Sequence, residues 1–256
     1  MGRDYLLFAG CMGASMKVFE SEDVLVKAAS AGLGPLLGRG GKAHTLFEHD
    51  AGFGRADVVL FSLHPGRARK RAKIAKGFAA RPSLARLLLS LQQRPLSLQS
   101  ILKRVRISRA SFRKCMSELI SAGLAERTET GCYQLKISPV HPVSNIIALE
   151  VKLSKWKRAL YQAQRYRAFA NASYVVLPAS AENTIRKHRN QFRKSHIGVV
   201  LVSHDHVARV LWKAKYSSPL SPVMRRLSEE RLLHGLVGQN FRVAIKDRNA
   251  VAKATR

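Results

Sequence analysis

Two residues at the end of an apolar stretch, Glu150 and Lys152, place a carboxylate and an ammonium two positions apart. The apolar run 146–149 fits the interior of a sheet, and Val151 continues the strand by alternation. Because a strand repeats every two residues, the two charged side chains lie about 7 Å apart along the strand on one face. This placement suits a metal site, and it also suits a charged pair on a solvated sheet face.

A second carboxylate, Asp57, opens another predicted strand, which follows a glycine turn as the second half of a β-hairpin. Hydrolysis of a phosphodiester with a divalent metal requires carboxylates that hold the metal and a cation that orients or deprotonates the attacking water and steadies the transition state. Asp57, Glu150 and Lys152 have those chemical types. Neighbouring strands of one sheet would bring both carboxylates to a shared edge, where the carbonyl of Val151 is a further candidate ligand.

The elements that must position these residues follow from the hydrophobic pattern. Residues 145–178 predict a buried strand, an amphipathic helix and a second buried strand, and 197–203 and 208–215 predict further strands. Residues 21–33 predict a helix, because acidic residues occupy its first turn and a glycine its end. A dense basic run at 64–76 is expected to be a solvated linker or helix face.

The charge of the chain limits the class of partner. The 45 Lys and Arg residues against 16 Asp and Glu leave a formal charge of +29, and the sequence pI is near 11.1. Such a field favours a polyanion, and nucleic acid is the leading candidate because phosphate neutralisation supplies most sequence-independent affinity. No long apolar segment or dominant basic amphipathic helix points to a membrane, so we expect no membrane partner.

Three cysteines, Cys11, Cys115 and Cys132, show no metal-like spacing. They suit free thiols in a reducing compartment, so we expect a cytoplasmic protein. The apolar stretch before Cys11 is too short for a signal peptide, and Asp4 interrupts the region that should be basic.

From 81 to 139 the pattern becomes helical and predicts three helices followed by two short extended pieces. Ser97 and Ser108 are the expected N-caps of the second and third helices, and Gly123 is expected to end the third. The segment resembles bacterial winged helix-turn-helix DNA-binding domains, although winged helices also serve as protein-interaction modules. The N-terminal residues of such a third helix reach the major groove. The residues expected to contact DNA there are Arg109, Ser111, Arg113 and Lys114, and those expected in the core are Phe112, Met116, Leu119 and Ile120.

The predicted helix that follows Lys152 is basic and lacks acidic companions, so we expect its cations to contact phosphates. Trp156 and Tyr161 on this helix fit base stacking, although aromatic residues at such spacing are more often core contacts. The glycine-rich segment 32–42 lacks the residues that a phosphate loop requires and is expected to be a loop. The expected phosphate partners on the helix are Lys155, Lys157, Arg158, Arg165 and Arg167.

The order of these features along the chain resembles the PD-(D/E)xK superfamily of restriction-endonuclease-like nucleases. The order is Asp57, then 150–152, then a helix bearing 162–166 and then the strand SYVVLP. The resemblance covers residues 20–62 and 144–203. It implies a mixed α/β sheet flanked by helices, and cleavage of DNA, expected to be double-stranded, with Mg²⁺ or Mn²⁺.

The resemblance also implies roles by position. Glu22 matches the acidic residue of the family's first helix, with Glu20 as the competing candidate. The implied metal ligands are Asp57, Glu150 and the carbonyl of Val151. The implied catalytic residues are Asp57, Glu150, Lys152, Gln162 and Glu22.

The sequence departs from the family at two points. Ala56 stands where the family has proline, and 93 positions separate Asp57 from Glu150. A winged helix-turn-helix domain inserted into the nuclease fold accounts for that separation. The expected domains are a first nuclease-like part at 1–76, the winged helix-turn-helix at 81–139, a second nuclease-like part at 144–240 and a basic tail at 241–256.

Other functions remain open at this point. A catalytically inactive DNA-binding or regulatory protein would use the winged helix and the basic surface for recognition alone. An RNA-binding or ribosome-associated basic protein is a more remote class. The oligomeric state is undecided, with a homodimer as one alternative.

Overall fold

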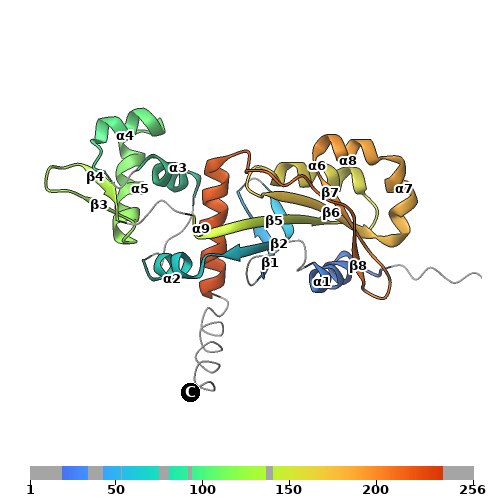
Figure 1. Ribbon diagram of the computed structural model, residues 1–256. Coiled ribbons are helices and arrows are strands. Elements are labelled where there is room, and N and C mark those ends of the chain that lie inside the picture. The colour runs from blue at the N-terminus through green and yellow to red at the C-terminus, as the bar shows by residue number, and fades with distance from the viewer. Residues whose placement is uncertain are drawn as a thin grey trace, which may run out of the picture.

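The computed structural model describes residues 19–33, 43–52, 54–74, 81–91, 94–136 and 141–238. A six-stranded sheet with its helices lies on one side of α9 (Pro222–Gly238), and a smaller helical body lies on the other side (Figure 1). Cys11, the glycine-rich segment from residue 34 onward and the predicted tail 241–256 lie outside the described residues.

The central sheet is mixed. Strands β5, β6 and β7 run parallel, and the remaining neighbouring pairs are antiparallel. The predicted hairpin and the strands predicted on both sides of the helical segment 81–139 therefore join one sheet, and the expected mixed α/β architecture is confirmed. In spatial order the strands are β1 (Ala43–Asp50), β2 (Arg55–Leu63), β5 (Val143–Val151), β6 (Ala172–Pro178), β7 (Gly198–Val202) and β8 (Ala208–Trp212).

Helices cover both faces of this sheet, so β6 and β7 are buried along their whole length. One core joins α1 to Leu149 and Val151 of β5. Another joins α6 and α8 to Val175 and Val199 on the opposite face. The helices around the sheet are α1 (Glu22–Gly32), α6 (Trp156–Tyr166), α7 (Glu182–Lys187) and α8 (Arg189–Ser195), with a 3-10 turn η2 (Ala179–Ala181) before α7.

The smaller body has its own hydrophobic core, separate from those of the sheet. This body consists of three helices followed by two short strands that form an antiparallel hairpin, which is the order predicted from the sequence. A backbone bridge between Leu96 and Tyr133 ties the segment before the second helix to the hairpin. These elements are α3 (Pro82–Ser90), α4 (Leu98–Val105), α5 (Arg109–Ser121), β3 (Ala125–Arg127) and β4 (Tyr133–Leu135).

Local signals decide where the helices of this body begin and end. The hydroxyl of Ser97 accepts a hydrogen bond from the backbone N–H of Ser100, and Ser108 does the same for Ser111, which confirms both predicted caps. Gly123 has a φ of 68°, the left-handed conformation that glycine adopts at low cost just after a helix.

The residues of α5 that the sequence predicted to lie in the core are buried, except for the last of them. Phe112, Met116 and Leu119 are buried, whereas Ile120 is 40% exposed. Positions 112, 116 and 119 form one stripe at helical spacing. Ile120 lies one residue beyond that stripe and is therefore turned toward solvent.

Helix α9 joins the two bodies, since it packs against α3 of the smaller body and against β1 and α2 (Pro65–Ile74) on the side of the sheet. Most of its charged residues are buried, because neighbouring elements cover them. The buried polar residues of α9 are Arg225, Arg226, Ser228, Glu229 and Glu230.

Within the predicted basic run, Pro65–Ile74 form α2, and one cation of this helix does not lie on a solvated face. Arg71 is buried and its Nη2 lies 2.5 Å from Glu230 Oε1. A buried guanidinium requires such a partner, because an unpaired charge away from water is strongly unfavourable. The expectation of a merely solvated helix face is therefore wrong at Arg71.

Candidate active site

The two predicted carboxylates come from neighbouring strands. In the antiparallel pair formed by β2 and β5, Val58 lies opposite Leu149, so the next residues along each strand, Asp57 and Glu150, face each other. Directly opposed residues project to the same face of a sheet. The two side chains therefore meet at one edge of the sheet, as the sequence predicted.

A hydrogen bond fixes this edge. The backbone N–H of Val151 donates to Asp57 Oδ2 at 2.7 Å, so the carboxylate of β2 closes onto the end of β5. Glu150 is fully buried and the side chain of Asp57 is 19% exposed. The alternative of a charged pair on a solvated sheet face is therefore excluded.

The ammonium of Lys152 lies at the centre of the cluster. Its Nζ is 3.1 Å from Glu150 Oε1, 3.2 Å from Glu22 Oε2 and 3.7 Å from Asp57 Oδ2. It also donates to the carbonyl oxygen of Val151 at 2.8 Å. One cation thus compensates three carboxylates that come from α1, β2 and β5.

Of the two acidic candidates near the first helix, the structure brings Glu22 to this cluster. Glu22 begins α1, and the hydroxyl of Ser21 caps the helix by accepting from the backbone N–H of Val24. The side chain of Glu22 is 47% exposed, so its contact with Lys152 lies at the mouth of the site. Glu20 precedes the cap and is exposed.

Tyr166 is a member of the cluster that the sequence placed on the helix without giving it a role. Its Oη lies 2.5 Å from Glu150 Oε2 and 2.6 Å from the carbonyl oxygen of Arg55. The hydroxyl has one hydrogen, so it donates to one of these oxygens, and both contacts are hydrogen bonds when the Glu150 carboxyl carries a proton. A signal was present, since Tyr166 is four residues after Gln162 on one helix face.

The electrostatics of the cluster favour a bound cation. Burial raises the pKa of Asp57 and that of Glu150, although Lys152 acts in the opposite direction on both. Burial alone would lower the pKa of Lys152, but the charges of Glu150 and Asp57 outweigh it and raise that pKa. Burial and the charge of Glu150 raise the pKa of Tyr166, which keeps its hydroxyl protonated.

The residues present fit a hard divalent metal such as Mg²⁺. Glu150 Oε1 is buried and accepts no hydrogen bond, since the nearby ammonium of Lys152 is close enough but not aimed for one. The carboxylates of Asp57 and Glu150 and the carbonyl of Val151 are oxygen ligands of the kind that Mg²⁺ prefers. Within the described residues, no three His, Cys, Asp or Glu side chains form a metal-holding group, so water would complete the shell.

Gln162 is the remaining residue that the resemblance assigned to the site. It lies on α6, one turn before Tyr166, and its Oε1 is buried without a hydrogen-bond partner. No bond therefore joins that oxygen to the carboxylates. The side-chain oxygen of Gln162 can therefore accept a hydrogen bond from a ligand that reaches this face of α6.

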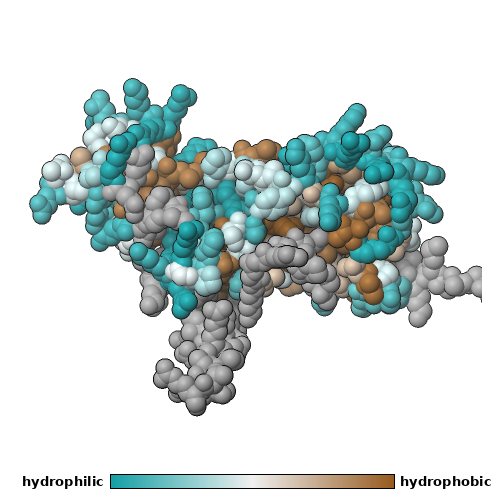
Figure 2. Space-filling model, viewed as in Figure 1, coloured by the Kyte–Doolittle hydropathy of each residue, from teal (hydrophilic) through white to brown (hydrophobic). Residues whose placement is uncertain are grey.

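The residues predicted to contact DNA lie on two separate surfaces. Those of α5 are all exposed, and Ser111 is also engaged by the Ser108 cap. Those around the start of α6 are exposed as well, whereas Trp156 is buried in the core and Tyr161 is 62% exposed. Figure 2 shows hydrophilic side chains gathered over the outer end of each body. The exposed cations of the second surface are Lys155, Lys157 and Arg158.

None of the helices in the described part of the chain has the length and apolar character needed to cross a membrane. Comparison of the chain with protein-family models, with curated proteins and with solved structures found no match.

Proposed function

We propose that this protein is a metal-dependent deoxyribonuclease of the PD-(D/E)xK type, which hydrolyses phosphodiester bonds of double-stranded DNA with Mg²⁺ or Mn²⁺. One observation carries the proposal. The ammonium of Lys152 lies within 4 Å of the carboxylates of Glu150, Glu22 and Asp57, which come from three different elements. Chance pairing of surface charges does not produce such convergence around a fully buried carboxylate.

Each residue of the cluster has a task in this reaction. Asp57, Glu150 and the Val151 carbonyl would hold the metal, which when bound polarises the phosphate and lowers the pKa of water. Lys152 is placed to bind a phosphate oxygen and to stabilise the negative charge that grows on it. Tyr166 holds the carboxyl of Glu150 in one orientation. Glu22 holds Lys152 from the mouth of the site.

The element order supports the same proposal. The helix with Glu22, the strand with Asp57 and the strand with Glu150 follow one another as in the family that the sequence resembles. The separate core of the body formed by α3, α4, α5, β3 and β4 supports an inserted domain. Its three helices and hairpin support a winged helix that docks the duplex through the exposed start of α5.

The departure at Ala56 does not disturb the site. Ala56 is fully buried and packs in the core beneath α6 and α9, so a small side chain is what this position accommodates. The pairing of β2 with β5, rather than a proline, sets the position of Asp57.

The test of activity uses supercoiled plasmid DNA with Mg²⁺, Mn²⁺ or EDTA. Wild type should nick or linearise the plasmid in either metal and leave it intact in EDTA. Lys152→Ala, Asp57→Asn and Glu150→Gln should each abolish cleavage, because each removes one charge of the cluster. Lys187→Ala removes an exposed cation on α7 and should cut like wild type.

Calorimetric titration with Mn²⁺ separates chemistry from binding. Wild type should bind the ion, and Asp57→Asn should weaken that binding at least tenfold. Equal cleavage by wild type and Lys152→Ala across several substrates and both metals would refute the catalytic assignment.

A second candidate, a DNA-binding protein without catalysis, is favoured by one observation. Lys152 already lies within ion-pair distance of all three carboxylates, so the cluster has a cation at its centre without a metal. That candidate predicts tight duplex binding in EDTA, no heat of Mn²⁺ binding and no cleavage. Arg113→Ala with Lys114→Ala should then weaken duplex binding and reduce the slope of log K against log salt by about 2.

A further inference from the structure

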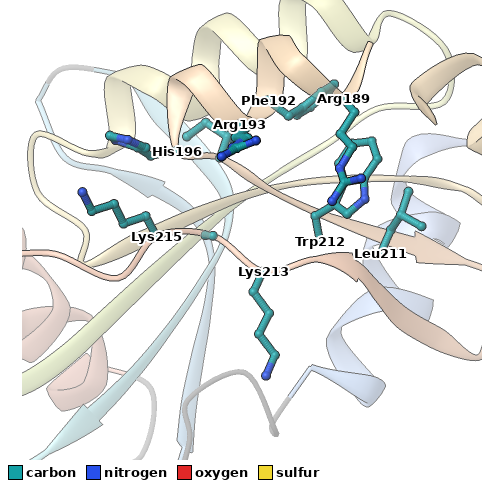
Figure 3. A pocket seen from close by; sticks show the side chains of 10 residues that line it. Arg189, Phe192, Arg193, His196, Leu211, Trp212, Lys213 and Lys215 are labelled. Atoms are coloured by element: carbon teal, nitrogen blue, oxygen red, sulfur yellow. The ribbon is translucent and has the colours of Figure 1, made fainter. Parts of the chain in front are cut away.

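A second basic site lies at the β8 edge of the sheet, between α8 and the segment that follows β8 (Figure 3). It is a hollow of about 460 Å³, a volume typical of sites that hold a small ligand or one unit of a polymer. Its walls combine the cations Arg189, Arg193 and Lys215 with the aromatic rings of Phe192 and Trp212. None of the residues considered above for catalysis or DNA contact lines it.

The backbone builds this hollow. The N–H of Lys215 donates to the carbonyl of His196 at 3.3 Å, which ties the segment after β8 to the end of α8. A Cβ at Gly198 would lie 2.7 Å from the backbone nitrogen of Ala214, so glycine permits this close approach. The cations on the two walls are therefore held at a defined separation.

The charge of the hollow is uncompensated. Its lining residues include four Lys and Arg and no Asp or Glu, and in the described part of the chain none of the four forms an ion pair. Other cations in this part of the chain do have acidic partners, since Arg186 and Arg209 both form ion pairs with Glu182. The uncompensated positive charge of the hollow therefore favours binding of an anion.

The aromatic wall narrows the class of anion. The guanidinium of Arg189 lies 6.0 Å from the centroid of the Trp212 ring, and the Phe192 ring lies 5.9 Å from the same ring. In Figure 3, Arg193 lies beneath α8, Lys215 extends from the opposite wall on the side of His196, and Lys213 points away. Phe192 is buried and supports Trp212, which is partly exposed. Cations beside a partly exposed aromatic ring are a combination by which proteins hold unpaired nucleotides.

Position in the sheet links this hollow to the candidate active site. Glu150 pairs with Val175, Val175 with Val199, and Val199 with Trp212, so the two sites share one row of the sheet. Three strand spacings separate Glu150 from Trp212, or about 14 Å. Helices α6 and α8 cover the strands between the two sites, so a nucleic-acid strand that contacts both would pass around these helices.

We infer that this hollow binds one nucleotide of an unpaired nucleic-acid strand, with its phosphate on Arg193 and Lys215 and its base against Trp212 and Arg189. The inference rests on the proposed function insofar as a nucleic acid is the partner, and it does not require cleavage. A paired base could not enter, because its ring faces are covered by its neighbours in the stack. The winged helix would then hold the duplex and the hollow an unpaired strand of the same substrate.

The experiment measures binding of fluorescein-labelled dT10 and of a 20-bp duplex by anisotropy, in EDTA so that cleavage plays no part. Arg193→Ala with Lys215→Ala should weaken dT10 binding at least tenfold and duplex binding less than twofold. Trp212→Ala should weaken dT10 binding about fivefold, and Trp212→Phe should restore most of it. Lys187→Ala with Lys194→Ala removes two exposed charges from α7 and α8 outside the hollow and should change dT10 binding less than twofold.

Specific outcomes overturn the inference. An equal loss of dT10 binding in the Lys187/Lys194 variant would show that net charge, not the hollow, binds the strand. Equal losses for dT10 and duplex would refute the preference for an unpaired strand. Tighter binding of AMP than of dT10 by wild type would make a free nucleotide the occupant. Circular dichroism of each variant excludes misfolding, and retained dT10 binding by Lys152→Ala separates this result from the nuclease test.

Discussion

Two regions of this molecule bury charged side chains, and they do so in different ways. Around α9, two arginines and two glutamates of the helix and Arg71 of α2 form ion pairs with one another. Arg225 also donates to the carbonyls of Val143 and Ser144. At the candidate active site, one ammonium faces three carboxylates, and Glu150 Oε1 accepts no hydrogen bond. The first set is nearly balanced in charge, and the second has an excess of negative charge.

The difference separates a structural cluster from a chemical one. Buried ion pairs with additional hydrogen bonds hold elements in register, and removing one partner leaves an uncompensated charge. The α9 network holds the helix between the two bodies in this way, although Arg71 retains nitrogens without hydrogen-bond partners. The cluster around Lys152 opens to solvent at Glu22, where the proposed function places a metal ion. The following predictions test that distinction.

The largest effect is expected on chemistry at Lys152. Lys152→Ala should lower the rate of DNA cleavage about 10³-fold, because it removes the cation that stabilises the phosphate in the transition state. Single-turnover cleavage of a labelled duplex in Mg²⁺ measures this rate. Lys152→Arg should recover part of the activity, and full activity in the alanine variant would place the chemistry elsewhere.

Removal of a partner from the α9 network should affect stability instead. Arg225→Met should lower the free energy of unfolding by about 3 kcal/mol, because Glu229 is left buried without its main partner. Urea denaturation followed by circular dichroism measures the loss. Arg186→Met breaks an exposed pair on α7 and should cost under about 0.5 kcal/mol. Similar losses in both variants would contradict a structural role for the network.

The same junction should respond to pH through His49, which lies 2.8 Å from Ser228 of α9. Burial, assisted by Arg231, lowers the pKa of His49 to about 4. Below pH 6.5 the unfolded chain binds a proton that the folded chain does not, so stability is fully present above that pH and falls as the pH drops toward 4. The loss from this residue between pH 7 and pH 5 should be about 2 kcal/mol.

Urea denaturation of wild type and His49→Gln at both pH values checks this expectation. Glutamine keeps a hydrogen-bonding side chain toward Ser228 but does not titrate. The difference in stability between the two proteins should therefore shift by about 2 kcal/mol in favour of the variant at pH 5. An unchanged difference would show that His49 is not the titrating group.

The smallest effect is expected at Tyr166. Tyr166→Phe removes the hydroxyl that orients Glu150 while keeping the buried ring, so cleavage should fall about tenfold, equivalent to about 1.4 kcal/mol. Higher Mn²⁺ concentration should restore part of the rate if Tyr166 positions a metal ligand. An unchanged rate would assign the residue to packing alone.

Local structure could be predicted from the sequence because its causes are local. The strand that ends in Glu150 follows from an apolar run, and the starts of α4 and α5 follow from Ser97 and Ser108 beside helical patterns. The chemical types of Asp57, Glu150 and Lys152 were readable too. Each of these features depends on residues a few positions apart.

Only the tertiary structure decided which of these residues meet. The register of β2 on β5 places Asp57 beside Glu150 across 93 positions. The packing of α1 on the sheet brings Glu22 rather than Glu20 to Lys152. The burial of the α9 charges and of Arg71 depends on what covers them, which no local pattern contains. Trp212 and the cations around it form a hollow only because β8 folds back on β7 beside α8. Side-chain type is a property of one position, whereas burial and convergence depend on contacts between distant ones.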